Sequence, residues 1–415
     1  MNIYLAVIIV ILIGQYVLTA VVERLNVRAA SPVLPGEFEG VYDAQSYARS
    51  QEYLKANTDL KMFEEAVHLV VILTVILAGG FNCVDMFARS FGAGAILSGL
   101  IFAGALMLLS QALNIPFSLY RTFVIEEKFG FNRMSLRTYI TDMVKGLVLG
   151  IMIGGPIFAL ILWFFGALGG WAWIACWIGV TLFSLFLTFI APVVIMPLFN
   201  KFVPLEPGEL KAAIEDYAKD QNFKLKGIFK MDGSRRSSKS NAFFTGLGKY
   251  RRIALFDTLI QSHTAGELVS ILAHEIGHFK KKHIIKNLIL SFINTGLMFW
   301  ILNFFLNNKG LFDAFRMEYV SVYGSLFFFG FLYTPVTIVL AVLANCLSRR
   351  HEYEADRFAV TTCGHPEDMI AALKKLTVHN LSNLTPHPVK VFMSYSHPPV
   401  LKRIEAIRAV CSCKL

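Results

Sequence analysis

Two histidines and a glutamate within one short stretch have the types and the spacing needed to hold a metal ion. They are His274, Glu275 and His278, in the pattern His-Glu-X-X-His. Histidines four residues apart lie on one face of a helix, so both imidazoles can bind one zinc ion. Glu275 can then reach the water that the metal activates, as a general base. The spacing therefore predicts zinc-dependent hydrolytic chemistry, with two of the metal ligands identified.

A third ligand is needed, because a catalytic zinc ion normally has three protein ligands and one open position. The segment after the last apolar stretch carries Glu352, Glu354 and Asp356. On a helix, Glu352 and Asp356 share one face and Glu354 points away from it. We therefore expect Glu352 to be the third ligand and Asp356 to accept a hydrogen bond from a ligand histidine. The same spacing also fits a solvated helix with charges four residues apart.

The metal-binding histidines must be presented by a helix, and the sequence marks where that helix starts. Thr264 and Glu267 have the spacing of a capping box, which predicts a helix from Ala265 through Lys282. Upstream, the residue pattern predicts a helix at 207–222, a strand at 224–231, and a hairpin of strands 241–245 and 252–256 around Gly246 and Gly248.

The rest of the chain is dominated by apolar stretches. Of the 415 residues, 55% are hydrophobic and 16% are charged, against roughly a quarter charged in soluble proteins. About 20 apolar residues cross a hydrocarbon core of roughly 30 Å. Seven stretches have this character, at residues 3–22, 66–84, 91–113, 146–166, 171–196, 288–306 and 322–346. They predict a mainly α-helical membrane protein with seven transmembrane helices and a catalytic domain that contains a small β-sheet.

Basic residues give the orientation. Of the 39 Lys and Arg residues, 34 fall in segments 23–65, 114–142, 201–283 and 347–415. Only Arg89, Lys309 and Arg316 fall in the loops that would lie on the opposite side of the membrane. Because basic residues stay on the cytoplasmic side, these four segments are predicted to face the cytoplasm. Membrane lipid therefore explains the net charge of +10, and we expect no nucleic-acid partner, since no motif that reads nucleic acid is present.

This topology divides the chain into four parts. Residues 1–200 hold the first five transmembrane helices, 201–283 the first half of the catalytic domain, 284–346 the last two transmembrane helices, and 347–415 the second half with the third ligand. Antiparallel spans joined by a short outside loop bring His278 and Glu352 to the same membrane face. The metal site is therefore predicted at the cytoplasmic mouth of the membrane.

The chain resembles the type I CAAX prenyl proteases, integral membrane zinc metalloproteases, over nearly its whole length. The likeness rests on segments 123–132 (FVIEEKFGFN), 241–260 (NAFFTGLGKYRRIALFDTLI), 274–278 (HEIGH), 352–359 (EYEADRFA) and 395–399 (YSHPP). The resemblance implies seven helices around a water-filled chamber, closed at one end by a zincin-like domain. It also implies removal of the last three residues of prenylated CaaX peptides.

The resemblance implies roles for further residues. His274, His278 and Glu352 match the zinc ligands and Glu275 matches the general base. Asp356 matches the carboxylate that orients a ligand histidine. Asn241 and His397 match residues that hold the substrate or the oxyanion, and Arg403 matches a basic residue near them. From the residues alone, Asn241 would be a turn residue and His397 a surface histidine. Many relatives have Gln in place of Glu354, which keeps Glu354 open as an alternative ligand.

Substrate binding is expected at the strand that contains Ala242, Phe243 and Phe244. If this is an edge strand, an extended peptide can pair with its backbone, whatever the peptide's side chains. The predicted partners are thus a peptide or protein substrate, prenylated or not, and membrane lipid, with Zn²⁺ as the cofactor. The predicted location is the inner membrane in a bacterium or the endoplasmic reticulum in a eukaryote, and the oligomeric state stays open.

Two other functions fit parts of this sequence. A membrane quality-control protease of broad specificity would use the same metal site. A seven-span receptor or transporter with a structural zinc is the more distant alternative. It normally needs ionisable residues inside the spans, where only His68 stands out. A structural zinc also has four ligands, which would leave Glu275 without a task.

Overall fold

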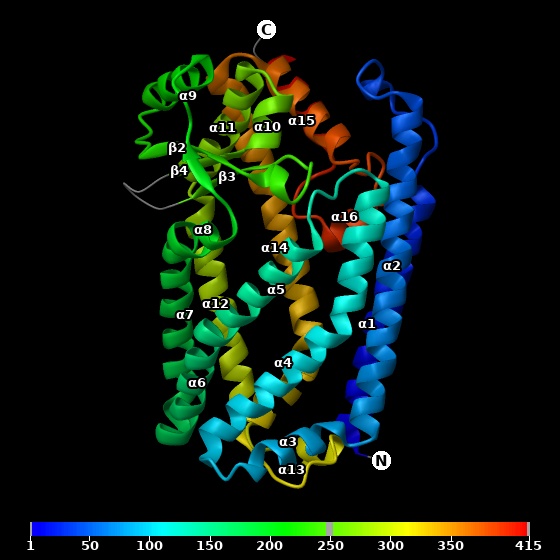
Figure 1. Ribbon diagram of the computed structural model, residues 1–415, viewed down its shortest axis with the longest axis vertical. Coiled ribbons are helices and arrows are strands. Elements are labelled where there is room, and N and C mark those ends of the chain that lie inside the picture. The colour runs from blue at the N-terminus through cyan, green and yellow to red at the C-terminus, as the bar shows by residue number, and fades with distance from the viewer. Residues whose placement is uncertain (1, 246–251, 413–415) are drawn as a thin grey trace.

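Long helices make up most of the protein, with a small mixed domain at one end (Figure 1). The structure, a computed structural model, describes residues 2–245 and 252–412. Within those residues, six helices are long and apolar enough to cross a membrane, or seven if one bent pair counts as a span. They are α1 (Ile3–Ala29), Gly94–Glu126, Leu136–Ala167, Gly169–Phe199, α12 (His283–Phe305) and α14 (Val322–Cys363). Six of the seven predicted apolar stretches therefore correspond to long continuous helices.

Three of these spans contain a π-helical turn. Helix α4 (Gly94–Tyr120) continues through such a turn at Arg121–Glu126. The turn Gly150–Gly154 joins α5 (Leu136–Leu149) to α6 (Gly155–Ala167), and the turn Ala191–Ile195 joins α7 (Ala172–Ile190) to α8 (Met196–Phe199). Pro192 lies within the last of these turns, where its missing N–H interrupts the regular α-helical hydrogen bonds.

The second predicted span, at 66–84, is wrong as a continuous helix. Helix α2 (Ala44–Leu77) ends inside it, and α3 (Gly80–Ser90) leaves at an angle of 65°. Gly79 between them has a φ of 73°, a conformation that glycine adopts without steric cost. The buried Asp85 holds α3 in place by accepting a hydrogen bond from Tyr323 (2.5 Å), and it also accepts one from Arg89 within α3 (2.8 Å).

The mixed domain contains a four-stranded sheet in the order β1-β2-β4-β3. Its strands are β1 (Phe202–Pro204), β2 (Gly227–Met231), β3 (Ala242–Thr245) and β4 (Arg252–Phe256). The antiparallel pairing of β3 with β4 confirms the two predicted hairpin strands, while Gly246 and Gly248 lie outside the described residues. The short β1 and the parallel pairing of β2 with β4 were not predicted. Strand β3 lies at the edge of the sheet, as expected.

Helices α9 (Glu209–Asp220), α10 (Asp257–Ser262) and α11 (Ala265–Lys280) pack with this sheet. Their shared core includes Ile214, Leu255, Leu259, Leu268 and Ile276. The predicted capping box is present: Thr264 accepts from the N–H of Glu267, and Glu267 accepts from the N–H of Thr264. Helix α11 therefore begins at the predicted residue, with the metal-binding motif in its last two turns.

The C-terminal segment completes the same end of the molecule. Helix α14 runs without a break from the membrane region to Cys363 and ends at Gly364, which has a φ of 74°. It is followed by α15 (Pro366–His379), α16 (Pro388–Ser394) and α17 (Val400–Ser412). The N-terminus lies at the opposite end, beside α3 and the short α13 (Lys309–Ala314) (Figure 1).

Candidate active site

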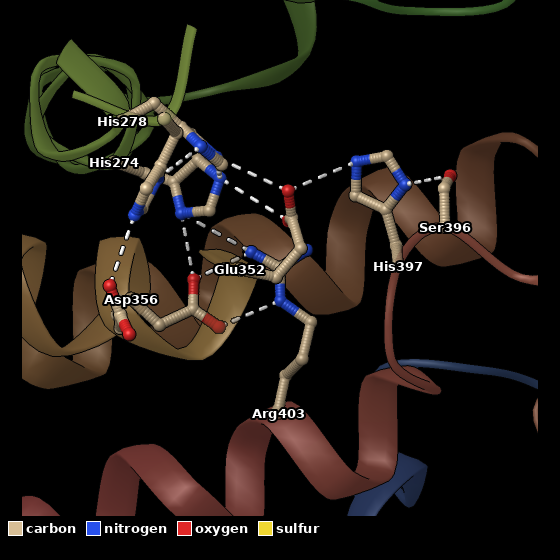
Figure 2. A network of polar contacts seen from close by, with 9 residues as sticks. His274, His278, Glu352, Asp356, Ser396, His397 and Arg403 are labelled. Carbon is tan, nitrogen blue, oxygen red and sulfur yellow. Dashed lines mark hydrogen bonds and ion pairs between the residues drawn. The ribbon is translucent and has the colours of Figure 1, made fainter. Parts of the chain in front are cut away.

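The candidate site forms where α11 and α14 lie closest together. A Cβ atom added at Gly277 would stand 3.1 Å from both the Cα and the carbonyl oxygen of Ala355. Backbones can approach this closely because glycine has no side chain. The contact brings His274 and His278 on α11 opposite Glu352 on α14 (Figure 2).

The three side chains converge on one point. The Nε2 atoms of His274 and His278 are 3.0 Å apart, and each lies near a Glu352 oxygen, at 3.4 Å and 3.2 Å. For metal bonds of about 2.0–2.1 Å, the edge of a tetrahedron is roughly 3.3–3.4 Å long, close to these separations. In the described part of the chain, this is the one cluster of three such residues whose ligand atoms lie within 4.8 Å of one another.

The residues fit a bound cation. Glu352 is only 3% exposed, and its Oε2 atom has no hydrogen-bond partner. Once both imidazoles are unprotonated, as metal binding requires, their facing Nε2 lone pairs, 3.0 Å apart, would repel without a cation between them. A buried carboxylate and buried lone pairs normally need a partner, and one divalent cation at this point would serve all three groups.

Asp356 orients His274. Its Oδ1 atom lies 2.8 Å from Nδ1 of His274, which leaves Nε2 facing the other ligands (Figure 2). Burial lowers the pKa of His274, but its hydrogen bond to Asp356 and the nearby carboxylate of Glu352 outweigh burial and raise that pKa to about 9. The expected contact between Asp356 and a ligand histidine is therefore present.

Arg403 lies behind Asp356 and holds it with two hydrogen bonds, at 2.8 Å and 2.6 Å. Its guanidinium is also 3.6 Å from Glu352, and its side chain is only 11% exposed. Although burial disfavours the charge, Asp356, Glu352 and Glu275 raise the pKa of Arg403. Glu275 itself is half-buried. These contacts hold Asp356 in position, and the contact of Arg403 with substrate stays a prediction.

His397 approaches the site from another direction. Its Nε2 atom is 3.5 Å from Glu352, and its Nδ1 atom is 2.9 Å from the Ser396 hydroxyl (Figure 2). The side chain is 63% exposed, so a bound substrate can reach it. An open cavity of about 630 Å³ lies beside it, lined in part by Tyr395 and Asn380.

The described contacts do not join Asn241 to this group. It is exposed at the start of β3, where its side-chain oxygen accepts from the N–H of Ala242 (2.8 Å). Ala242 is half-buried, and its backbone pairs with Leu255. For Phe243 and Phe244 the structure describes the backbone, which pairs with β4, but not the side chains.

Sequence reasoning missed two groups near the site. His283 contacts His278 on the side away from Glu352, and Glu354 in turn contacts His283. The signal was a third histidine five residues after His278. Lys239, just before β3, binds Glu126 (2.9 Å) and Tyr53 (2.7 Å). Glu126 lies inside the FVIEEKFGFN segment, so this cluster ties that segment to the strand expected to bind substrate.

Comparisons with known proteins agree with this architecture. Residues 23–201 match the CAAX prenyl protease N-terminal domain, described as five membrane helices, and residues 204–411 match peptidase family M48. The rice CAAX prenyl protease 1 homolog is 36% identical over 99% of both chains. CAAX prenyl protease 1 of Saccharomyces cerevisiae is 35% identical over 94% of this chain and 91% of its own.

A solved structure agrees equally well. The crystal structure of S. mikatae Ste24p superposes with a TM-score of 0.93 at 32% sequence identity, covering 97% of this chain and 99% of that one. Such agreement over the full length covers both the membrane helices and the domain that carries the metal-binding residues. The chain therefore belongs to peptidase family M48, among its membrane-embedded CAAX prenyl proteases.

Proposed function

We propose that this protein is a zinc-dependent endopeptidase that removes the last three residues of prenylated CaaX peptides at the cytoplasmic face of its membrane. The observation that carries the proposal is the convergence of His274, His278 and Glu352 where α11 meets α14. The names of the relatives, which are CAAX prenyl proteases, support the substrate class.

Zinc is the metal that the ligand set favours. The family implies a metal, and two imidazoles with one carboxylate, spaced by 3.0–3.4 Å, suit zinc. Calcium prefers six to eight oxygen ligands at about 2.3–2.6 Å, which this site does not offer. When bound, zinc polarises the scissile carbonyl and makes water a stronger nucleophile near neutral pH.

The protein's own residues would handle the protons and the developing charge. Glu275 takes a proton from the attacking water and delivers it to the leaving nitrogen. His397 and Asn241 donate to the oxyanion, a contribution of about 3 kcal/mol for each donor. The exposed edge of β3 pairs with the extended peptide, and Arg403 keeps Asp356 and His274 in place.

The membrane helices have the low burial expected around a hollow interior. In the most apolar 18 residues of the spans Leu136–Ala167 and Gly169–Phe199, only 6% and 0% of the residues are buried. A solid bundle buries the inward face of every helix, so these values support a chamber. The excess of basic residues at the catalytic end supports a cytoplasmic orientation. The rice and yeast relatives support the eukaryotic case of the predicted location, the endoplasmic reticulum membrane.

Reporter fusions test this orientation. A reporter inserted at Arg235 and one at the C-terminus should both map to the cytoplasm, with the N-terminus on the other side. Reporters at these two positions that map to opposite sides would refute the proposed topology.

One peptide with and without its farnesyl group tests the substrate. If the chamber receives the isoprenoid, kcat/KM should be much higher for the farnesylated peptide, because buried apolar carbon adds up to about 0.8 kcal/mol per CH₂-sized unit. The variant Glu275→Gln, measured in parallel, controls for a contaminating protease. A ratio near one would favour the quality-control alternative, since strand pairing along β3 is blind to lipid.

A further inference from the structure

The second histidine of the motif is held differently from the first. His274 has the Asp356 carboxylate on its Nδ1 atom, whereas Nδ1 of His278 faces Nδ1 of His283 at 3.0 Å. The other nitrogen of His283, Nε2, lies 3.1 Å from Oε2 of Glu354. A chain of hydrogen bonds thus runs from α11 through the first residue of α12 to α14.

We propose that His283 and Glu354 are positioning residues that orient His278 for metal binding, as Asp356 does for His274. The inference rests on the proposed function, because it takes His278 as a metal ligand. It also gives Glu354 a task that is separate from that of Glu352, the neighbouring carboxylate on α14.

The proton positions along the chain are consistent. A metal on Nε2 of His278 requires the proton on its Nδ1 atom, which then donates to His283. His283 must accept through Nδ1 and therefore carries its own proton on Nε2. Glu354, as a carboxylate, can only accept, so it selects this tautomer of His283. The reverse arrangement would put a proton on Nε2 of His278, where the metal should bind.

The surroundings fix His283 in this orientation. It is 2% exposed, and its ring stacks on that of His351 with centroids 3.9 Å apart and an angle of 11° between the planes. Lys282, which precedes it, has a φ of 58°, a left-handed conformation that is uncommon for lysine. This turn between α11 and α12 carries His283 back toward His278.

Glu354 is held in its charged form by basic neighbours. Arg350 lies 3.2 Å from Oε1, and Lys286 lies 3.9 Å from the Oε2 atom that faces His283. The carboxylate is therefore fixed on the side of α14 that faces α12, away from Glu352. Partners of this kind behind a ligand histidine typically change metal affinity by about 10–100-fold.

Zinc release from the purified full-length protein tests the proposal. The rate is measured with an excess of a coloured chelator, alongside the melting temperature of the metal-free protein. His283→Phe keeps a flat ring in the stack but removes the acceptor, and we expect zinc release to become about 10–100-fold faster. His351→Phe is the matched control, since it changes the stacked histidine that has no hydrogen bond to His278, and its release rate should stay near that of the wild type.

Comparing the two variants distinguishes a specific effect on His278 from a general loss of stability of the protein. Equal acceleration in His283→Phe and His351→Phe, or no acceleration in His283→Phe, overturns the proposal. If His283→Phe does not fold, Glu354→Ala replaces it: faster zinc release with an unchanged melting temperature of the metal-free protein supports the proposal, and unchanged release overturns it. His278→Ala tests the function on which the inference rests, because zinc retained in that variant would refute His278 as a ligand.

Discussion

The substitution Gly277→Ala tests whether the close contact between α11 and α14 sets the geometry of the metal site. The added Cβ would lie 3.1 Å from two backbone atoms of Ala355 and 3.2 Å from the Cβ of Phe358, whereas ordinary contact begins at 3.4 Å. Because the Ala355 atoms are backbone, the two helices must separate by at least about 0.3 Å. Ligand distances in metal sites tolerate about 0.2 Å, so the shift should disturb zinc binding.

The expected effect on stability is small, while the effect on the metal is larger. Overpacking costs about 1–3 kcal/mol, but replacing Gly by Ala within a helix returns about 0.8–1.0 kcal/mol. The metal-free protein should therefore lose roughly 0–2 kcal/mol. Zinc affinity should fall about tenfold, or about 1.4 kcal/mol, since His274 and His278 move relative to Glu352.

Competition with a chelator of known affinity measures the zinc dissociation constant of the variant. Gly330→Ala is the matched control, because this glycine lies in α14, the other helix of the contact, and a Cβ there would have no atom within 4 Å. It should bind zinc as the wild type does. A Gly277→Ala protein with the affinity of the Gly330→Ala control would show that the helix contact does not set the ligand geometry.

Three further outcomes follow from the site. Glu275→Gln should abolish hydrolysis and keep zinc, and metal analysis that found no zinc, or an assay that still found cleavage, would remove Glu275 as the base. Glu352→Ala should lack zinc even when zinc is in excess, because Glu352 is a proposed ligand. Glu354→Ala should still bind zinc and cleave peptide under the same condition. The opposite pattern would make Glu354 the metal ligand in place of Glu352. In the folded metal-free protein the pKa of His274 is raised from 6.5 to about 9, so zinc must displace a proton from His274 in order to bind between these two pH values. The affinity of the protein for zinc should therefore rise up to tenfold per pH unit between pH 6.5 and about 9. Across the same window the metal-free protein should lose the stability that protonated His274 provides, which thermal melts at several pH values will detect.

Local sequence patterns predicted the elements that carry the site. Thr264 and Glu267 marked the start of α11, because a capping box involves neighbouring residues only. Aromatic and β-branched residues located β4 at Arg252–Phe256, and helix periodicity put Glu352 and Asp356 on one face. In each case the residues that define the feature are close in sequence.

The unpredicted features depend on contacts between distant segments. The three-residue β1 contains Pro204 and is too short to show a pattern, and it pairs with β2 only in the folded domain. The contact of Arg403 with Asp356 and that of His283 with Glu354 join residues 47 and 71 positions apart. Nothing in the local sequence specifies such partners, although a histidine in the turn after a metal-binding helix could have indicated the second.

The continuity of α14 determines how far the metal site lies from the lipid. Cys346 ends the last apolar stretch, and Glu352 is six residues further along the same helix, which is about 9 Å at 1.5 Å per residue. An extended peptide spans roughly 3.3–3.6 Å per residue, so at least about three residues are needed to reach the metal from the edge of the apolar region. A peptide bond closer than that to a lipid-modified residue reaches the metal only if the lipid leaves the edge and enters the space among the membrane helices. Cleavage directly beside a lipid-modified residue therefore requires the membrane helices to receive the lipid, and a preference for a prenyl chain must come from those helices.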